Sequence, residues 1–296
     1  MIKNRKKCPA VYCIPAIILI LLIIVFPIIY TGYISLTNMN VFHWDDYHVI
    51  GLNNYKRALF KLDTGFWSAM GATIFWTFCN MVIQVVLAFL IALMLNRKNL
   101  KLKRFYKTLL MFPWAMPAYV SILVWRVGMF NTEFGLLNKI ITAFGGKKID
   151  FLATSGIAFV SCTILNLWLA MPFMICMMDG ALQSIDKNLY ESAMLDGAGF
   201  IKKNFYITIP AIKKIMAPAI IMTTFTTFKQ FDIVYLLTRQ KGAMTGSSFQ
   251  TIITYAHENA FVSNNYGLSS AVSMIIFIFI ICFSIFTNRG IKEEQI

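Results

Sequence analysis

Six long apolar segments constrain this chain more than any other feature. They cover approximately residues 10–36, 69–95, 108–130, 157–178, 211–237 and 267–287. A helix of about 20 apolar residues crosses the hydrocarbon core of a bilayer, so each segment is long enough to span it. Only 14% of the residues are charged, whereas soluble domains average about 25%. The sequence therefore predicts an all-α membrane protein with six transmembrane helices.

Basic residues gather in alternate connections between these segments and predict the orientation. The basic excess lies in the loops 96–107 and 179–210 and in the N-terminal residues Lys3, Arg5, Lys6 and Lys7. The other loops balance their charges or carry few basic residues, as at Arg239 and Lys241. Because basic loops stay on the cytoplasmic side, we expect a multi-pass protein of the cell membrane with both termini in the cytoplasm. The net charge of +14 follows from these loops and does not indicate nucleic-acid binding.

The residue pattern predicts no catalytic residue and no metal site. The six cysteines include no Cys-x-x-Cys pair, and most lie in apolar segments, where cysteine behaves as a small hydrophobe. The three histidines lack the spacing of a metal site. A phosphate-binding loop of the form Gly-x-x-x-x-Gly-Lys-[Ser/Thr] is also absent from the sequence. We therefore expect no cofactor and no enzymatic activity, and any ATP that drives the protein would bind to another chain.

The loop 179–210 contains a predicted polar helix with a defined start and stop. Asp186 is suited to cap its N-terminus, and Gly197 is suited to end it in a left-handed conformation. After this stop we expect a second short helix around Phe200 at the membrane surface, before the next span begins at Pro210.

The polar face of this predicted helix is acidic, with Asp186, Glu191 and Asp196. An amphipathic helix that lies on lipid instead carries a basic polar face, because anionic headgroups repel carboxylates. We therefore interpret the helix as a docking surface for a soluble partner, with lipid binding as the alternative.

Polar residues inside the spans are candidates for a substrate path, because they are costly in a membrane. Thr223, Thr226, Thr227 and Gln230 follow helical spacing in the fifth segment and predict one hydroxyl-bearing face. Such a face suits a neutral polyol, since each hydroxyl donates and accepts hydrogen bonds. The alternative is that these threonines serve helix packing and bond to their own backbone.

Other span residues give weaker signals. Asn166 and Phe173 in the fourth segment offer an amide and an aromatic ring to a sugar. Pro113 and Pro117 predict a broken helix in the third segment. Arg126 is expected to extend its charge toward the outer surface of the membrane.

Lys229 and Asp232 near the outer end of the fifth segment are interpreted as a mutually neutralising helical pair. A proton relay at this pair is the alternative that an ion-coupled secondary transporter would require. Such a transporter would more often show an inverted repeat, and the sequence shows no clear one.

Several motifs resemble one family of transport proteins. Glu191-Ser192-Ala193, Asp196-Gly197-Ala198 and Ile207-Thr208-Ile209-Pro210 resemble the EAA loop of binding-protein-dependent ABC importer permeases, with Ser192 and Ile209 as mild departures. The motifs at 51–55 (GLNNY) and 134–138 (FGLLN) resemble the carbohydrate branch of that family. Segments 112–125, 166–177 and 187–199 resemble the larger-type subunit of maltose/maltodextrin permeases in its compact form. The sequence departs from this group at 238–242, where Thr-x-Gly-Gly-Pro is usual.

The resemblance implies a type I ABC importer permease core that transports a maltodextrin-like sugar by alternating access. It implies a permease core at 69–287, preceded by a span and external loop at 1–68 and followed by a tail at 288–296. The implied partners are a second permease subunit in a heterodimer, a cytoplasmic ATPase dimer, an external sugar-binding protein and membrane lipid. Another neutral sugar or polyol is the alternative substrate, and an ion-coupled secondary transporter is the less favoured alternative function.

The resemblance also implies two sets of functional residues. The residues that would couple to the ATPase are Glu191, Ser192, Ala193, Asp196, Gly197, Ala198 and Pro210. The residues that would line the sugar path are Trp114, Ala118, Asn166, Leu169, Ala170, Phe173, Thr223, Thr226 and Thr227.

Overall fold

The computed structural model describes residues 12–60, 65–97, 100–238 and 249–295, and it describes no side chains beyond Thr287. These residues form helices and connecting loops, without a β-strand. The basic N-terminal residues that predicted the orientation, together with Arg239 and Lys241, lie outside the described residues.

Five helical stretches in the described residues are long and apolar enough to cross a membrane, and a sixth span is a bent pair of helices. The five stretches are Ile14–Ser35, Phe66–Leu95, Ser155–Gln183, Phe200–Thr238 and Tyr266–Thr287. The bent pair consists of Lys103–Ala115 and Ala118–Met129, whose axes meet at 94°. The prediction of an all-α fold with six membrane segments is confirmed, with the third segment broken.

The break in the third segment lies at Met116, where α5 (Lys103–Ala115) ends and α6 (Ala118–Val124) has not yet begun. Met116 is extended, with φ −92° and ψ 136°. The ring of Pro117 disfavours a helical conformation at the residue before it. Pro117 also lacks an N–H group, so the backbone hydrogen bonds of α5 cannot continue through it. The sequence therefore specifies the bend locally.

The described chain divides into two compact units. One holds the residues up to Trp67 together with Tyr255–Ile281, and the other holds Ser68–Thr254 with the chain from Cys282 onward. The first unit contains α1 (Ile14–Ile20), the π-helical turn η2 (Leu21–Val25), α2 (Phe26–Ser35), α3 (Asn53–Phe60), most of α13 (Ile252–Phe261) and the first part of α14 (Tyr266–Gln295).

A buried asparagine organises the loop that follows α2 in the first unit. Asn54 is 6% exposed, and its Nδ2 donates to the carbonyls of Ser35 at 2.9 Å and Thr37 at 2.7 Å. Gly267 packs so closely here that a Cβ at this position would collide with the Thr37 carbonyl. The GLNNY motif therefore fixes the end of α2 through Asn54, because these carbonyls have no partner in the helix itself.

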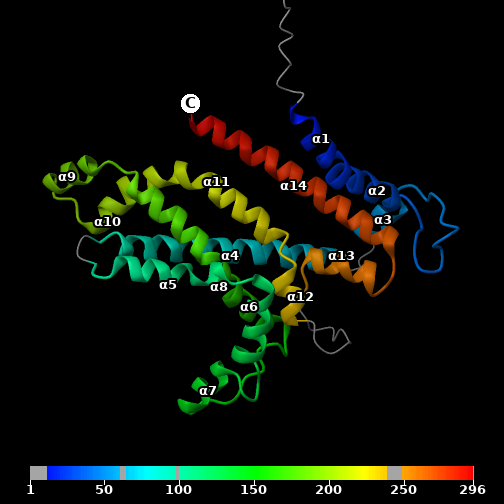
Figure 1. Cartoon of the computed structure of the whole chain (residues 1–296), viewed down its shortest axis with the longest axis horizontal. Helices are drawn as coiled ribbons and strands as arrows, with labels where there is room; N and C mark the ends of the chain where they lie inside the picture. The colour runs from blue at the N-terminus through cyan, green and yellow to red at the C-terminus, as the bar shows by residue number, and fades with distance from the viewer. Residues whose placement is uncertain (1–11, 61–64, 98–99, 239–248, 296) are drawn as a thin grey trace, which may run out of the picture. The chain divides into compact units, whose positions relative to one another are not determined.

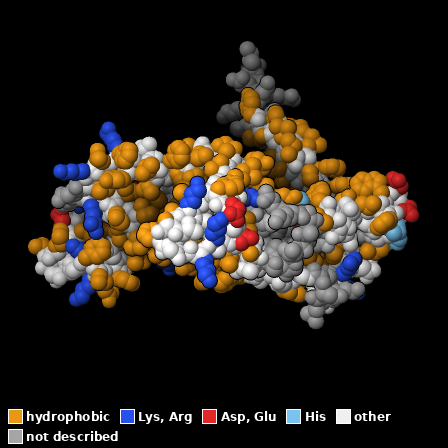
Figure 2. All heavy atoms as spheres, turned by 90° about the horizontal axis from the view of Figure 1, so that it is seen from below, with side chains coloured by type: hydrophobic (Ala, Val, Ile, Leu, Met, Phe, Trp, Pro, Cys, Tyr) orange, Lys and Arg blue, Asp and Glu red, His pale blue; other side chains and the backbone are white. Residues whose placement is uncertain are grey.

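The second unit is a bundle with the loop helices at its ends. Its elements are α4 (Phe66–Leu95), α5, α6, the π-helical turn η4 (Trp125–Met129), α7 (Leu136–Ala143), α8 (Ser155–Gln183), α9 (Lys187–Leu195), α10 (Phe200–Lys203), the π-helical turn η5 (Asn204–Thr208), α11 (Ile209–Phe228) and α12 (Asp232–Thr238). Helices α9 and α10 lie at one end of this unit, and α7 projects from the end where α8 begins (Figure 1). Figure 2 shows basic side chains over the end that carries α9 and α10, and a largely hydrophobic surface beside it.

The FGLLN motif contains a second buried asparagine, which organises the loop around α7. Asn138 is 1% exposed, and its Nδ2 donates to the carbonyls of Asn131, Thr132 and Ile149. Its Oδ1 accepts from the Ile149 N–H at 2.9 Å. One side chain therefore satisfies three carbonyls and one amide of an irregular loop, as buried backbone groups require.

Candidate functional site

The helix predicted in the loop 179–210 is present as α9, with the predicted ends. The Asp186 side chain accepts a hydrogen bond from the Asn188 N–H at 3.0 Å, which satisfies one free donor of the first turn. Gly197 adopts φ +74°, the left-handed conformation that favours glycine. Gly197 N–H donates to the Met194 carbonyl at 3.1 Å, and Ala198 N–H donates to the Ala193 carbonyl at 2.9 Å. This pair of bonds is a Schellman motif, so the helix stop is built into the backbone.

None of the residues of α9 is buried within the chain. Leu195 is 90% exposed and Met194 is 53% exposed. Glu191, Ser192 and Asp196 are exposed, whereas Ala193 and Ala198 are half-buried. A nine-residue helix is marginal in water unless one face packs against another surface. The chain itself therefore leaves the apolar and acidic residues of α9 uncovered.

One side chain of α9 connects this helix to the next span. The Tyr190 hydroxyl lies 3.0 Å from the Thr208 hydroxyl, and Thr208 is 1% exposed at the base of α11. Tyr190 also packs against the apolar cluster that includes Ile212 and Met216. Tyr190 therefore joins α9 to the start of α11.

The predicted second surface helix is not separate from the following span. Helix α10 begins at Phe200 and continues through η5 into α11, so that one helical path runs from Phe200 to Phe228. Pro210 lies in the first turn of α11, where proline needs no backbone donor. The predicted second short helix is therefore present at Phe200, and it continues into the span without a break, because proline is compatible with the η5–α11 junction.

Two of the predicted sugar-path residues form an aromatic pair. The ring centroids of Trp114 in α5 and Phe173 in α8 lie 6.1 Å apart, within the range of favourable aromatic contacts. Trp114 is 62% exposed, and Ala118 is exposed directly after the break in the third span. Leu169, Ala170 and Phe173 are half-buried. The broken span thus brings an open aromatic surface to α8.

Asn166 points toward another helix. Its Nδ2 donates to Asn80 Oδ1 of α4 at 2.7 Å, and the two residues are 4% and 0% exposed. The amide therefore joins α4 to α8 inside the bundle.

The threonines of the predicted hydroxyl-bearing face in the fifth segment differ in their exposure. Thr223 and Thr227 are buried, whereas Thr226 is exposed. The hydroxyl of Thr223 donates to the Ala219 carbonyl at 2.8 Å, and that of Thr226 donates to the Thr223 carbonyl at 2.9 Å. These bonds to the same helix match the packing alternative, and Thr226 is the threonine of this group whose side chain is exposed.

A polar face of α4 was missed by the sequence analysis. Trp76 Nε1 donates to the Thr227 carbonyl at 3.3 Å, and Asn80 binds Asn166. Gln84 is fully buried one turn further along, and its side-chain amide has no hydrogen-bond partner among the described residues. The spacing 76, 80 and 84 places all three on one face, which was the signal available in the sequence.

Two predictions about charged residues in the spans were also wrong. Arg126 is 9% exposed, and its guanidinium donates to the Leu236 carbonyl of α12 at 2.7 Å, so its charge does not extend to the surface. Lys229 and Asp232 do not form a helical pair, because α11 ends at Phe228 and α12 begins at Asp232. The ion pairs of the described side chains join other residues.

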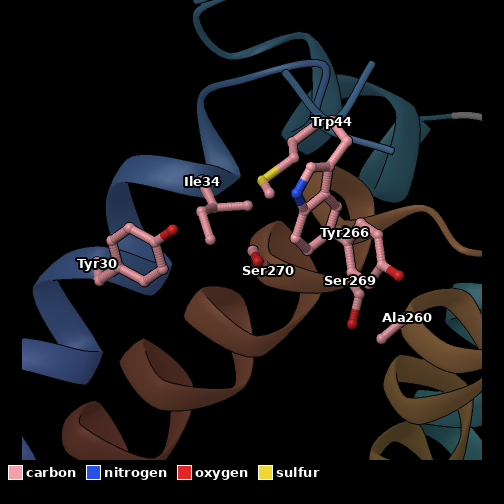
Figure 3. A pocket seen from close by; sticks show the side chains of 8 residues that line it. Tyr30, Ile34, Trp44, Ala260, Tyr266, Ser269 and Ser270 are labelled. Atoms are coloured by element: carbon pink, nitrogen blue, oxygen red, sulfur yellow. The ribbon is translucent and has the colours of Figure 1, made fainter. Parts of the chain in front are cut away.

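A cavity of about 200 Å³ lies in the first unit, and none of the predicted sugar-path residues lines it. Its lining residues are Tyr30, Ile34, Met39, Trp44, Ala260, Tyr266, Ser269 and Ser270. Figure 3 shows aromatic side chains around it, with Trp44 next to Tyr266, and these two rings meet edge to face at 5.4 Å. The Ser269 hydroxyl donates a hydrogen bond to the Ala256 carbonyl at 2.7 Å.

Known proteins resemble this chain over nearly its full length. The galactooligosaccharides transport system permease protein GanP of Bacillus subtilis is 31% identical over 295 residues, which cover 96% of this chain and 70% of GanP. The trehalose/maltose transport system permease protein MalF of Thermococcus litoralis is 31% identical over 282 residues, which cover 95% of this chain and 92% of that protein.

The fold is also known from solved structures. The crystal structure of a bacterial ABC transporter involved in the import of the acidic polysaccharide alginate contains a chain that matches with a TM-score of 0.81 and 20% identity. The match covers 96% of this chain and 94% of that chain, and it shows a type I ABC importer permease fold. Residues 84–289 match the family described as "Binding-protein-dependent transport system inner membrane component". The present chain therefore belongs to this family of ABC importer permeases.

Proposed function

We propose that this chain forms part of the translocation path for a neutral oligosaccharide of the maltodextrin type. As a permease subunit of an ABC importer it is not itself an enzyme, and ATP is hydrolysed on a separate subunit. The named relatives transport trehalose and maltose or galactooligosaccharides, which supports a sugar as the substrate class.

The observation that carries the sugar proposal is the Trp114–Phe173 pair beside the break in the third span. Aromatic rings stack on the apolar faces of sugar rings, and hydroxyls such as that of Thr226 exchange hydrogen bonds with sugar hydroxyls. None of the predicted path residues carries a charge. This set of side chains suits a neutral sugar better than an anionic one, which requires basic partners.

The exposed face of α9 supports the proposed partners. Its apolar residues Met194 and Leu195 lie beside the carboxylates of Glu191 and Asp196, without cover from the rest of the described chain. In our proposal a cytoplasmic ATPase subunit binds this face, and a second permease chain completes the path. An external sugar-binding protein delivers the substrate, and both termini of this chain lie in the cytoplasm.

Uptake by the purified complex in proteoliposomes tests the proposal. With ATP inside and maltotriose plus the binding protein outside, we expect accumulation of maltotriose that stops when ATP is withheld. Uptake of an anionic alginate trisaccharide in preference to maltotriose would overturn the assignment of a neutral sugar. Uptake driven by an ion gradient without ATP would overturn the coupling mechanism.

Another neutral sugar remains the second candidate, because a galactooligosaccharide permease is also among the relatives. The same assay with galactotriose separates the two candidates. Faster ATP-driven uptake of galactotriose than of maltotriose would assign a galactooligosaccharide as the substrate and leave the proposed ATP-driven mechanism unchanged.

A further inference from the structure

A buried carboxylate joins three helices at the base of the loop that carries α9. Asp179 lies near the end of α8 and is 8% exposed. Its Oδ2 forms an ion pair with Lys107 Nζ of α5 and accepts from Gln183 Nε2 at 2.8 Å. Its Oδ1 accepts from Asn96 Nδ2 at 2.8 Å, directly after the end of α4. We name these four residues the Asp179 cluster.

The cluster is a rigid connection. Burying a carboxylate costs free energy unless charged and neutral donors replace its water. Here three donors from three different positions replace it, and hydrogen bonds to ionised groups are stronger than neutral ones. Asn96 is itself held, because its Nδ2 also donates to the Ala92 carbonyl at 2.9 Å. The ends of α4, α5 and α8 are therefore fixed to one another at one carboxylate.

The position of the cluster relates the docking helix to the sugar path. Asp179 stands seven residues before Asp186, the N-cap of α9. Lys107 stands seven residues before Trp114 on the same helix α5. On the other side of α9, Tyr190 reaches α11 through Thr208. A force applied to α9 thus reaches α8 and α11 directly, and it reaches the start of α5 through the Asp179 cluster.

We propose that the Asp179–Lys107 ion pair is a positioning contact that makes the first half of the broken third span follow the motion of α9. This inference rests on the proposed function, in which an ATPase moves α9. When the ion pair is lost, α8 still moves with α9, but α5 and its Trp114 no longer follow. The expected defect is ATP hydrolysis that moves less sugar per cycle.

The test is the ratio of sugar transported to ATP hydrolysed by the full complex in proteoliposomes. We expect Asp179→Asn and Lys107→Met each to lower this ratio about fivefold or more, at the lower end of typical coupling between sites. The double variant should be no worse than either single variant, because both remove the same contact. Lys107→Arg should retain most of the wild-type ratio of sugar transported to ATP hydrolysed, since it keeps the positive charge.

Arg104→Gln is the matched control, because Arg104 is an exposed basic residue of the same helix. It should leave the ratio unchanged. If the ion pair had a purely structural role, its loss would lower the yield and the melting temperature of the assembled complex but leave the ratio of sugar transported to ATP hydrolysed normal. This result would overturn the inference. Multiplicative effects in the double variant would also overturn it. A wild-type complex that takes up no sugar with ATP would instead contradict the proposed function.

Discussion

The proposed docking helix α9 and the predicted sugar path differ in how their side chains are arranged. Apart from Pro210, the candidate coupling residues lie within α9 and its C-terminal stop, and most of them are exposed; the ends of α9 are set by local contacts at Asp186 and Gly197. The predicted sugar path draws on α5, α6, α8 and α11, and its polar members Asn166 and Thr223 bond within the bundle. A surface that binds a partner can be specified locally, whereas a path through a bundle depends on how helices pack.

The largest effect is expected at the stop of α9. Gly197→Pro cannot adopt φ +74° and removes the N–H that bonds to Met194. We expect the substitution to cost about 3 kcal/mol or more in free energy, which is the cost of a proline inside a helix. We therefore expect sugar uptake to fall by about 100-fold or more, since each 1.4 kcal/mol is about tenfold. Transport assays in proteoliposomes measure this loss.

Glycines two residues apart provide a control for this prediction. Gly197→Ala should be impaired, because an L-residue in the left-handed region costs about 1–2 kcal/mol. Gly199→Ala should be silent, because Gly199 has φ −70° and open space around the position of a Cβ. Equal transport by the two alanine variants would show that the conformation of the α9 stop does not matter.

The next largest effect tests whether Asn166 belongs to the bundle or to the sugar path. Asn166→Leu leaves the buried Oδ1 of Asn80 without its donor, at a cost of about 1–3 kcal/mol. We expect a lower melting temperature of the purified complex. The double variant Asn80→Leu/Asn166→Leu should recover part of the stability, because neither polar group is then left unpaired. A normal melting temperature with weaker sugar transport would instead place Asn166 in the path.

A smaller effect is expected at the aromatic pair. Trp114→Ala or Phe173→Ala should raise the KM for sugar uptake with little change in melting temperature, because an aromatic contact contributes about 0.5–1.5 kcal/mol. Phe112→Ala, another exposed aromatic of α5, is the control. If all three variants raised KM equally, the pair would have no special role in binding sugar.

The smallest effect distinguishes two threonines that differ in exposure. Thr226→Val should raise the KM for sugar uptake, because it removes one hydrogen bond that contributes about 0.5–1.5 kcal/mol of binding free energy. Thr223→Val should leave KM unchanged, because its hydroxyl is buried and bonded to Ala219. Uptake measured over a range of sugar concentrations separates the two, and the reverse order would mean that Thr223 faces the path.

The sequence predicted those features whose causes are local. The six membrane segments follow from length and hydrophobicity, the α9 stop follows from Gly197, and the broken third span follows from Pro117. The Asp179 cluster and the Asn80–Asn166 bond were not predicted, because each joins residues more than 70 positions apart. Arg126 was misplaced for the same reason, since its acceptor at Leu236 lies on another helix.

The 94° bend between α5 and α6 also has a consequence for the order of assembly in the membrane. The second half, Ala118–Met129, has 12 residues and measures about 18 Å, well short of the roughly 30 Å hydrocarbon core. It cannot cross alone in its final shape. Because Pro117 specifies the bend locally, we expect the two halves to enter the membrane together as one bent segment, which the accessibility of a Tyr119→Cys variant to a thiol reagent during synthesis would show.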